Sequence, residues 1–175
     1  MKRLIYLSLI LFLAGCSTLK INTQYDRTVN FSNYNTWCWF NNCTPTFEGP
    51  DYIYPDRIMD DMVNFIALEM DGKGYKMGDD LSDLLVDFHV IVVEDSTKNG
   101  YVFEEDLPLW DKYKNDQYYH FLKGTLIIDV ADRKKGKIIY RSVIENQISK
   151  YSQISNKEIM RGIKKALKDL PPRSE

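Results

Sequence analysis

Asp87 and His89 come closest in this sequence to an arrangement that could do chemistry. They lie two positions apart in the alternating run over 84–93, so they share one face of a predicted strand. A carboxylate placed there can orient an imidazole, which is half of an acid/base pair. No Gly-x-Ser-x-Gly nucleophile elbow completes the site. We therefore interpret the two residues as a structural or surface pair and expect no catalytic residue.

The other charged clusters are weaker candidates for a site. The chain has two histidines, which excludes a His-rich zinc site. Asp129 with Asp132, and the acidic run over 104–106, lack the spacing of a calcium loop and are more typical of solvated strand ends and loops. The basic residues over 133–137 could touch lipid head groups, but a solvated turn is the default. We expect neither a metal nor a cofactor.

The N-terminus has the pattern of a secretory signal. Lys2 and Arg3 precede an apolar run over 4–13 that is too short to span a bilayer. The run ends in Leu13-Ala14-Gly15-Cys16, which resembles the lipobox at which bacterial lipoproteins are lipidated on the cysteine and cleaved just before it. The resemblance implies that Cys16 carries the lipid.

This resemblance divides the chain into four parts. Residues 1–15 are expected to be a signal peptide, 16–22 the lipid anchor and a short tether, 23–172 a single domain, and 173–175 a tail. Because several acyl chains hold a protein stably in a bilayer, we expect permanent membrane attachment with palmitate among the acyl chains. Ser17 in place of Asp favours the outer membrane, and the lack of an acidic cluster after the anchor favours its periplasmic face.

Composition limits the possible partners and the redox state. The formal net charge is -2, which gives no electrostatic reason to bind nucleic acid. In an oxidising envelope, Cys38 and Cys43 are candidates for a disulfide that would close a small loop. Two buried thiols are the alternative, because strand geometry could point the side chains apart.

Periodicity predicts the elements that hold these residues. The expected strands, helices and loops are: strands over 21–31, 36–40, 84–93, 125–131 and 138–144; helices from Pro55 to Gly72 and from Ser155 to Pro171; a loop over 41–50 and an irregular segment over 95–119. A bulged turn at Gly136 should place Ile138, Tyr140 and Ile144 on the face of Leu126, Ile128 and Val130. The order predicts a two-layer α+β fold, a mixed or mostly antiparallel sheet with two amphipathic helices on one face.

Several landmarks, in order, resemble a family of bacterial lipoproteins known as domain of unknown function 4136. They are Tyr25-Asp26, the run over 31–37, Lys73-Gly74-Tyr75, the run over 83–89, the run over 124–132 and Pro171-Pro172. The most specific is Gly124-Thr125-Leu126-Ile127-Ile128-Asp129. Tyr140 stands where the family tends to have Trp. The resemblance implies a fold and a location but no activity.

Aromatic residues gather in the irregular segment. Tyr101, Phe103, Trp110 and Tyr113 have the composition of a protein interface, and they form the candidate partner surface. The alternative is that they cover the second face of the sheet. Asp95-Ser96-Thr97 also resembles a short acceptor for O-glycosylation in bacterial envelopes.

The expected function is a non-catalytic, lipid-anchored envelope protein that acts as a binding or assembly module. Its partners would be the membrane, through the lipid, and an envelope protein or glycan. The first alternative is a small-ligand or glycan-binding lipoprotein with a concave pocket lined by Trp37, Trp39 or the aromatic residues of the segment over 95–119. A weaker alternative is an envelope hydrolase that uses the Asp87 and His89 pair.

Replacing the lipidated cysteine tests the anchor. The Cys16→Ala variant should lose all labelling by radioactive palmitate and should accumulate as uncleaved precursor, because thioether formation precedes cleavage in the pattern it resembles. Palmitate incorporation equal to that of the unmodified chain would contradict the assignment.

Overall fold

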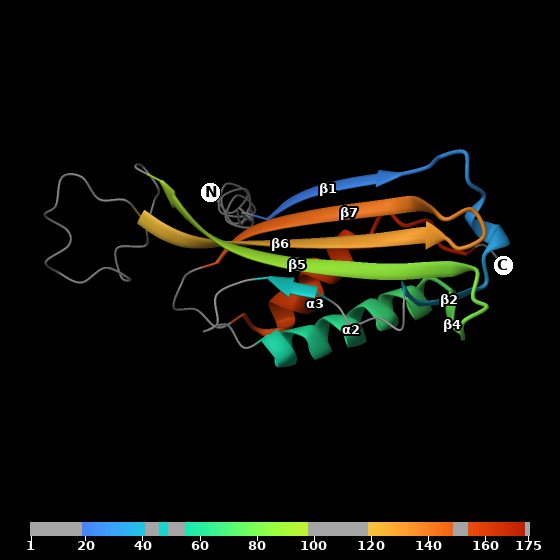
Figure 1. Cartoon of the computed structure of the whole chain (residues 1–175), viewed down its shortest axis with the longest axis horizontal. Coiled ribbons are helices and arrows are strands. Elements are labelled where there is room, and N and C mark those ends of the chain that lie inside the picture. The colour runs from blue at the N-terminus through green and yellow to red at the C-terminus, as the bar shows by residue number, and fades with distance from the viewer. Residues whose placement is uncertain (1–18, 41–45, 49–54, 98–118, 149–153, 174–175) are drawn as a thin grey trace, which may run out of the picture.

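The computed structural model describes residues 19–40, 46–48, 55–97, 119–148 and 154–173. These residues form one seven-stranded sheet with two helices on one face (Figure 1). The strands are β1 (Lys20–Tyr25), β2 (Thr36–Trp39), β3 (Thr46–Glu48), β4 (Lys76–Met77), β5 (Leu84–Thr97), β6 (Tyr119–Asp132) and β7 (Lys137–Ile148). The helices are α2 (Pro55–Gly72) and α3 (Asn156–Ala166), and a short 3-10 helix, η2, covers Phe31–Asn33. The predicted two-layer α+β class is confirmed.

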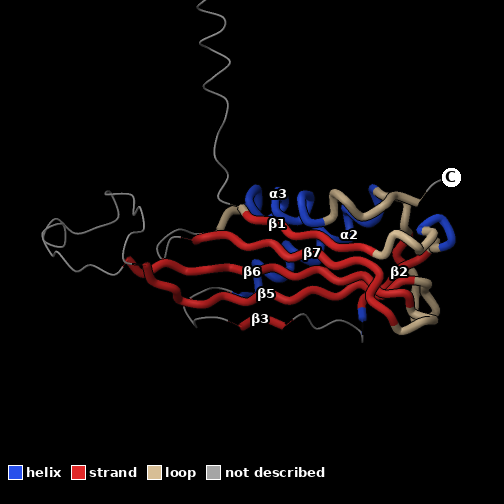
Figure 2. Tube along the Cα trace, turned by 90° about the horizontal axis from the view of Figure 1, so that it is seen from above, coloured by secondary structure: helices blue, strands red, loops and turns tan. Residues whose placement is uncertain are grey.

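The sheet is mixed. Its strand order is β1-β7-β6-β5-β2-β4, with β3 also beside β5 (Figure 2). The ladders among β1, β7, β6 and β5 are antiparallel, whereas β2 and β3 run parallel to β5 and β4 runs parallel to β2. The long β5–β6 hairpin is therefore the centre of the sheet, and β1 lies at one edge.

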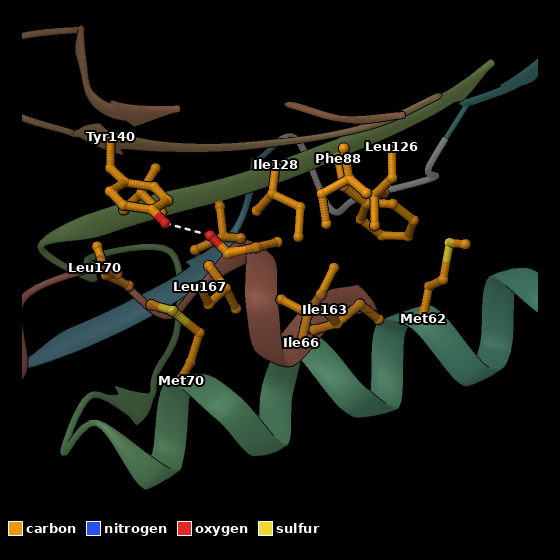
Figure 3. Close-up of a cluster of buried hydrophobic side chains, with 14 of the residues drawn as sticks. Met62, Ile66, Met70, Phe88, Leu126, Ile128, Tyr140, Ile163, Leu167 and Leu170 are labelled. Atoms are coloured by element: carbon orange, nitrogen blue, oxygen red, sulfur yellow. Dashed lines mark hydrogen bonds between the residues drawn. The ribbon is translucent and has the colours of Figure 1, made fainter. Parts of the chain in front are cut away.

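Alternation along the central strands builds a core on one face only. The side chains that alternate inward are buried: Leu84, Val86, Phe88, Val90 and Val92 on β5; Leu122, Leu126, Ile128 and Val130 on β6; Tyr140 and Ile144 on β7. They pack against the buried stripes of the two helices (Figure 3). The methionines predicted to fill the core do so, since Met62 and Met70 lie among these residues.

The two helices begin and end where the sequence provides the signals. At α3, Ser155 and Glu158 form the predicted capping box, and both reciprocal hydrogen bonds are present. Arg57 in the first turns of α2 donates to the Ile154 carbonyl and to Asn156 Oδ1, both at 3.1 Å, which joins the starts of the helices. Helix α2 ends at Gly72, and the turn that follows it contains Gly74, whose φ of 90° suits glycine.

The connection between β6 and β7 contains a bulge, as predicted, but one residue after it lies on the opposite face of the sheet from the one predicted. Gly136 has a φ of 59°, and the β6–β7 register shifts between Val130 and Ala131. Tyr140 lies opposite Val130 as expected, whereas Ala131 lies opposite Ile138 and Ile139 is the extra residue. Ile138 is consequently exposed and Ile139 is buried, so the prediction for Ile138 was wrong.

Several boundaries also differ from expectation. The first strand ends at Tyr25, and Phe31 belongs to η2, where its ring is buried. Part of the expected loop over 41–50 is the strand β3, and the two-residue β4 was not predicted. The central strands extend into the segment expected to be irregular, with β5 reaching Thr97 and β6 beginning at Tyr119.

Helix α2 offers a matched pair of substitutions for the core. Ile66 is 0% exposed and Leu68 is 62% exposed on the same helix. Ile66→Ala should lower the free energy of unfolding by about 2–5 kcal/mol, because it leaves a cavity. Leu68→Ala should change it by less than about 0.5 kcal/mol. Urea unfolding followed by circular dichroism measures both, and equal effects would contradict this packing.

Candidate functional site

The face of the sheet turned away from the helices is the candidate site, and we call it the open face. Its members alternate with the buried residues: Leu85, Asp87, His89, Ile91 and Val93 on β5; Lys123, Thr125, Ile127, Asp129 and Ala131 on β6; Arg141, Val143, Glu145 and Gln147 on β7. All are half-buried or exposed. In Figure 2 no helix of the described chain crosses this face.

The centre of the open face is apolar. Ile127 lies directly opposite Val143 on β7 and opposite His89 on β5. Ile91 is the diagonal neighbour of Ile127, two positions along β5. The three aliphatic side chains are each half-buried, so they form a small hydrophobic area that water reaches.

Two carboxylates face each other beside this apolar centre. Asp87 and Asp129 are direct cross-strand partners, an arrangement that like charges normally disfavour. Each has a basic neighbour: His89 Nε2 lies 3.2 Å from Asp87 Oδ2, and Arg141 holds Asp129 through two bonds of 2.6 Å. The hydrogen bond and charge of Asp129 raise the pKa of Arg141 above its ordinary value. The structure therefore brings the predicted Asp87 and His89 pair together within a larger charged group.

A second ion pair borders the other side of the apolar centre. Lys123 Nζ lies 3.3 Å from Glu145 Oε1, and both side chains are 36% exposed. Along its strands, the open face thus carries a charged group, then the aliphatic centre, and then a second charged pair. This composition matches that of a protein contact surface, in which apolar side chains are framed by polar ones.

The sequence indicated only part of this site. Alternation along β5 located Asp87, His89 and the aliphatic residues of its second face. It could not show that Asp129 and Arg141 are their cross-strand neighbours, because a register must be known before opposite residues can be named. The bulged turn predicted at Gly136 was the one available signal, because it put Tyr140 on the core face and so Arg141 on the opposite face.

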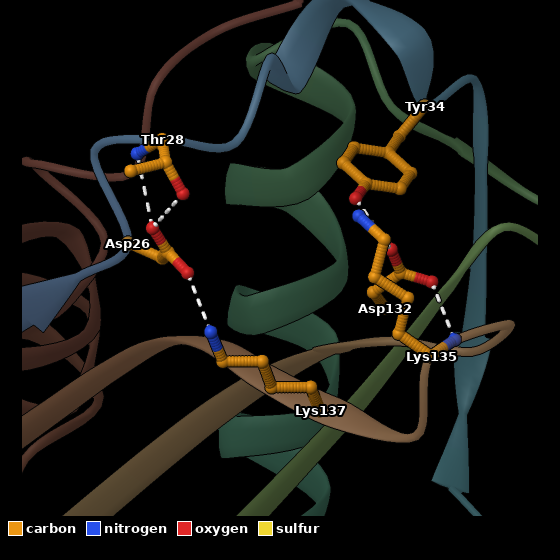
Figure 4. A network of polar contacts seen from close by, with 6 residues as sticks. All are labelled: Asp26, Thr28, Tyr34, Asp132, Lys135 and Lys137. Carbon is orange, nitrogen blue, oxygen red and sulfur yellow. Dashed lines mark hydrogen bonds and ion pairs between the residues drawn. The ribbon is translucent and has the colours of Figure 1, made fainter.

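A separate polar network lies at the end of the sheet near the β6–β7 turn (Figure 4). Asp26 Oδ2 binds Lys137 Nζ at 2.7 Å and accepts two bonds from Thr28 on its other oxygen. The hydrogen bonds from Lys137 and Thr28 lower the pKa of Asp26. These contacts fix the turn that follows β1 to the start of β7.

Asp132 is the buried member of the same network. It is 4% exposed and accepts a bond of 2.8 Å from the Tyr34 hydroxyl, while Lys135 Nζ lies 3.1 Å from its Oδ2. Burial alone raises the pKa of Asp132, but the bonds from Tyr34 and Lys135 outweigh it, so the net shift is downward. Burial and the same carboxylate raise the pKa of Tyr34 to about 12.

Asp83, just before β5, attaches that strand to the start of β2. Its Oδ2 accepts bonds from the amides of Asn35 at 2.8 Å and Thr36 at 3.2 Å, and the Asp83 amide donates to the Thr36 hydroxyl oxygen at 3.1 Å. The bond from the Asn35 amide is the main reason that the pKa of Asp83 is lowered. Most charged members of the network are satisfied by each other, so we interpret it as structural.

Several predicted site residues lie outside the described part of the chain. These are Cys16, Cys43, Tyr101, Phe103, Trp110 and Tyr113. Cys38 is half-buried on β2, with Arg133 Nη1 3.6 Å from its sulfur, and its bridge to Cys43 stays a prediction. Ser96 and Thr97 lie on β5, and their modification also stays a prediction.

Of the two tryptophans named for the small-ligand alternative, Trp37 lies in the core and Trp39 packs against it, while the aromatic residues over 101–113 lie outside the described residues. Trp37 is 1% exposed and belongs to the core. Trp39 packs edge-on against Trp37 with 5.0 Å between ring centroids and also contacts Phe88. Within the described ranges, no group of three or more His, Cys, Asp or Glu side chains could hold a metal. Nor does any helix in those ranges have the length and apolarity needed to span a membrane.

The model of the Domain of unknown function (DUF4136) family matches residues 21–172. The chain belongs to this family. The landmarks of the DUF4136 resemblance include Asp26, Tyr34, Asp83 and Asp132, and the structure brings all four into the polar network. No curated protein matches the sequence.

Solved structures share the DUF4136 fold. A DUF4136 family protein from Bacteroides thetaiotaomicron is similar, with a TM-score of 0.52 and 15% identity over 91% of this chain and 99% of that one. The PelC dodecamer from Paraburkholderia phytofirmans has a TM-score of 0.51 and 6% identity over 89% and 99%. A PDZ domain protein from Parabacteroides distasonis has a TM-score of 0.53 and 12% identity over 94% of this chain, which spans 39% of that protein. At these identities, the likeness is one of fold.

The polar network predicts how stability depends on pH. Because the pKa of Asp132 is lower in the folded chain than its ordinary value of 3.8, its contribution is present above that value and is lost as the pH falls. The free energy of unfolding should therefore drop below about pH 5, and Asp132→Asn should flatten this drop. At pH 7 the variant should be less stable by about 1–3 kcal/mol, since Tyr34 loses a charged acceptor in a buried site.

A matched control is Asp80→Asn, an exposed carboxylate with no hydrogen bond or ion pair to the described residues. It should reproduce the unmodified profile in urea titrations between pH 3 and 7. An unaltered acid slope in Asp132→Asn would contradict the assigned role of Asp132.

Proposed function

We propose that this DUF4136 chain is a non-catalytic, lipid-anchored protein of the bacterial cell envelope that binds another envelope protein through the open face. The observation that carries the proposal is the half-exposed aliphatic centre of Ile91, Ile127 and Val143 between two charged groups. A one-sided sheet normally covers such a face or leaves it polar. A partner that supplies apolar side chains and opposite charges would fit it.

A protein partner fits better than a glycan. Sugar rings are commonly bound by stacking on exposed aromatic side chains, and the open-face residues named above include no Trp, Tyr or Phe. Tyr119 and Phe121 continue the same alternation at the start of β6. Trp37, one of the residues named for the glycan alternative, is in the core. The aliphatic centre instead offers the contact that a hydrophobic protein surface would bury.

A binding role also fits the Asp87 and His89 pair better than catalysis. Both residues belong to an array in which carboxylates are matched to basic groups across the strands, as Asp129 is to Arg141. The register partners of His89 are Ile127 on β6, an aliphatic residue, and Thr46 on β3, which stands in none of the sequence settings that activate a hydroxyl as a nucleophile. The pair therefore serves as a charged border of the contact surface.

The lipobox resemblance supports the location. An anchor at Cys16 lies four positions before β1, so the domain is held close to the bilayer. Ser17 after the cysteine leads us to place the protein at the outer membrane, facing the periplasm. In this setting, the open face would meet other envelope proteins within a short distance of the membrane.

Crosslinking in living cells tests the contact surface. A photoreactive amino acid at position 127 should give a discrete adduct with a single envelope protein. At position 68, on the exposed side of α2, it should give none. Ile127→Lys should then reduce recovery of that partner by about tenfold, the effect of losing about 1.4 kcal/mol of binding energy.

The folding of Ile127→Lys is checked by thermal unfolding, with Leu68→Lys as the matched exposed control. Adducts that form equally at positions 127 and 68, or adducts to glycan alone at position 127, would contradict the proposal. Loss of the partner in Leu68→Lys as well would show that the surface has been placed on the wrong face.

A further inference from the structure

In the described part of the chain, strand β1 is an open edge of the sheet. It is the outermost strand in both views, and its described partner is β7 alone (Figures 1 and 2). Its six residues are exposed except for the half-buried Thr23. An edge strand presents a row of free N–H and C=O groups, which is a template for pairing with another chain.

The usual protections of an edge are missing from β1. The segment Lys20–Tyr25 contains no proline, and its ladder with β7 has no register shift that would mark a bulge. Its charged residue, Lys20, stands at the end of the strand and not in its middle. By contrast, the strands at the opposite side of the sheet, β3 and β4, have three and two residues. Among the described strands, β1 is therefore the edge with room for a partner strand.

The hydrogen bonds to β7 show which β1 residues have free backbone groups. The amide of Asp26 donates to the Ile139 carbonyl at 2.9 Å. Backbone bonding alternates along an antiparallel ladder, so Ile21, Thr23 and Tyr25 turn their N–H and C=O groups outward. A second antiparallel strand must match these three positions.

The sequence of β1 is complementary to itself when the pairing is centred on Thr23. Thr23 then lies opposite the same residue of the second copy, Ile21 lies opposite Tyr25, and Asn22 lies opposite Gln24. Pairs of threonines, and of an aromatic with a β-branched residue, are among those that stabilise antiparallel sheets. Ile21 and Tyr25 are each 40% exposed and would be covered by the pairing.

Charge agrees with the same register. Lys20 falls opposite Asp26 of the second copy, which keeps its own ion pair with Lys137. Both ends of the paired strands would therefore join opposite charges. The two-fold register centred on Ile21 pairs that residue with itself but leaves Thr23, Gln24 and Tyr25 outside the paired segment. The remaining two-fold registers place Ile21 opposite Thr23 or beyond the paired segment.

We infer that two copies of the chain pair antiparallel through β1, about a two-fold axis at Thr23, to form one continuous sheet. The two-fold axis is perpendicular to the sheet, so both N-terminal ends can reach a single membrane that lies parallel to the sheet. The pairing goes beyond the proposed function, because it uses the edge of the sheet and leaves the open face free.

Cysteine crosslinking of the full-length chain in the envelope tests this pairing, in a background with Cys38→Ser and Cys43→Ser. Thr23→Cys should give a disulfide-linked dimer, since directly opposite α-carbons in a hydrogen-bonded pair lie about 5.5 Å apart, a separation that a disulfide spans. Asn22→Cys alone and Gln24→Cys alone should give little dimer, because each is two residues out of register with its own copy. Coexpression of these two variants should restore the dimer, at about half the Thr23→Cys yield or more, since α-carbons of a non-hydrogen-bonded pair lie about 4.5 Å apart.

Each other outcome overturns the inference. Absence of dimer in Thr23→Cys excludes the edge pairing, and dimer in all single variants alike shows random collision. A Thr23→Cys adduct of another mass shows that a different protein occupies the edge. Circular dichroism of the purified variants checks that each remains folded. The result is independent of the open face, where failure would appear as loss of the position 127 adduct.

Discussion

The register of β5, β6 and β7 determines both faces of the sheet. Side chains alternate with a period of two, so a shift of one residue would move the charged array into the core and the core onto the surface. The bulge at Ile139 lets two successive residues, Ile139 and Tyr140, be buried near the start of β7. The Tyr140 hydroxyl then donates to the Ala166 carbonyl of α3, which joins the sheet to the helix layer. Helix packing and the open face thus follow from one set of strand pairs.

The family landmarks acquire a physical meaning from the polar network. Asp26, Tyr34, Asp83 and Asp132 are separated by up to a hundred residues, yet they close the same end of the sheet. A buried carboxylate such as Asp132 is stable only when hydrogen bonds replace its water, and Tyr34 and Lys135 supply them. These four landmark residues therefore hold the fold together.

Periodic signals explain why much of the fold could be predicted. Apolar residues recur with the helical period of 3.6 residues along α2 and at every second residue along β5. The capping box at Ser155 marks the start of α3. Strands β3 and β4 have three and two residues, too few to show a period. The prediction that Ile138 lies on the core face was wrong because the extra residue of the bulge has no sequence signal of its own. The charged half of the open face depends on long-range pairing, which local patterns do not contain.

The position of β1 determines how the domain resists a force that pulls on the N-terminal side of the chain. Any pull on the chain before Lys20 enters the body through this strand. Its ladder to β7 runs from the Lys20–Glu145 pair to the Tyr25–Tyr140 pair, with the hydrogen bonds perpendicular to the strand. Force along the strand therefore loads these bonds together in shear and does not open them one after another. The Asp26–Lys137 ion pair follows the far end of β1, so it must also break before the strand separates from β7.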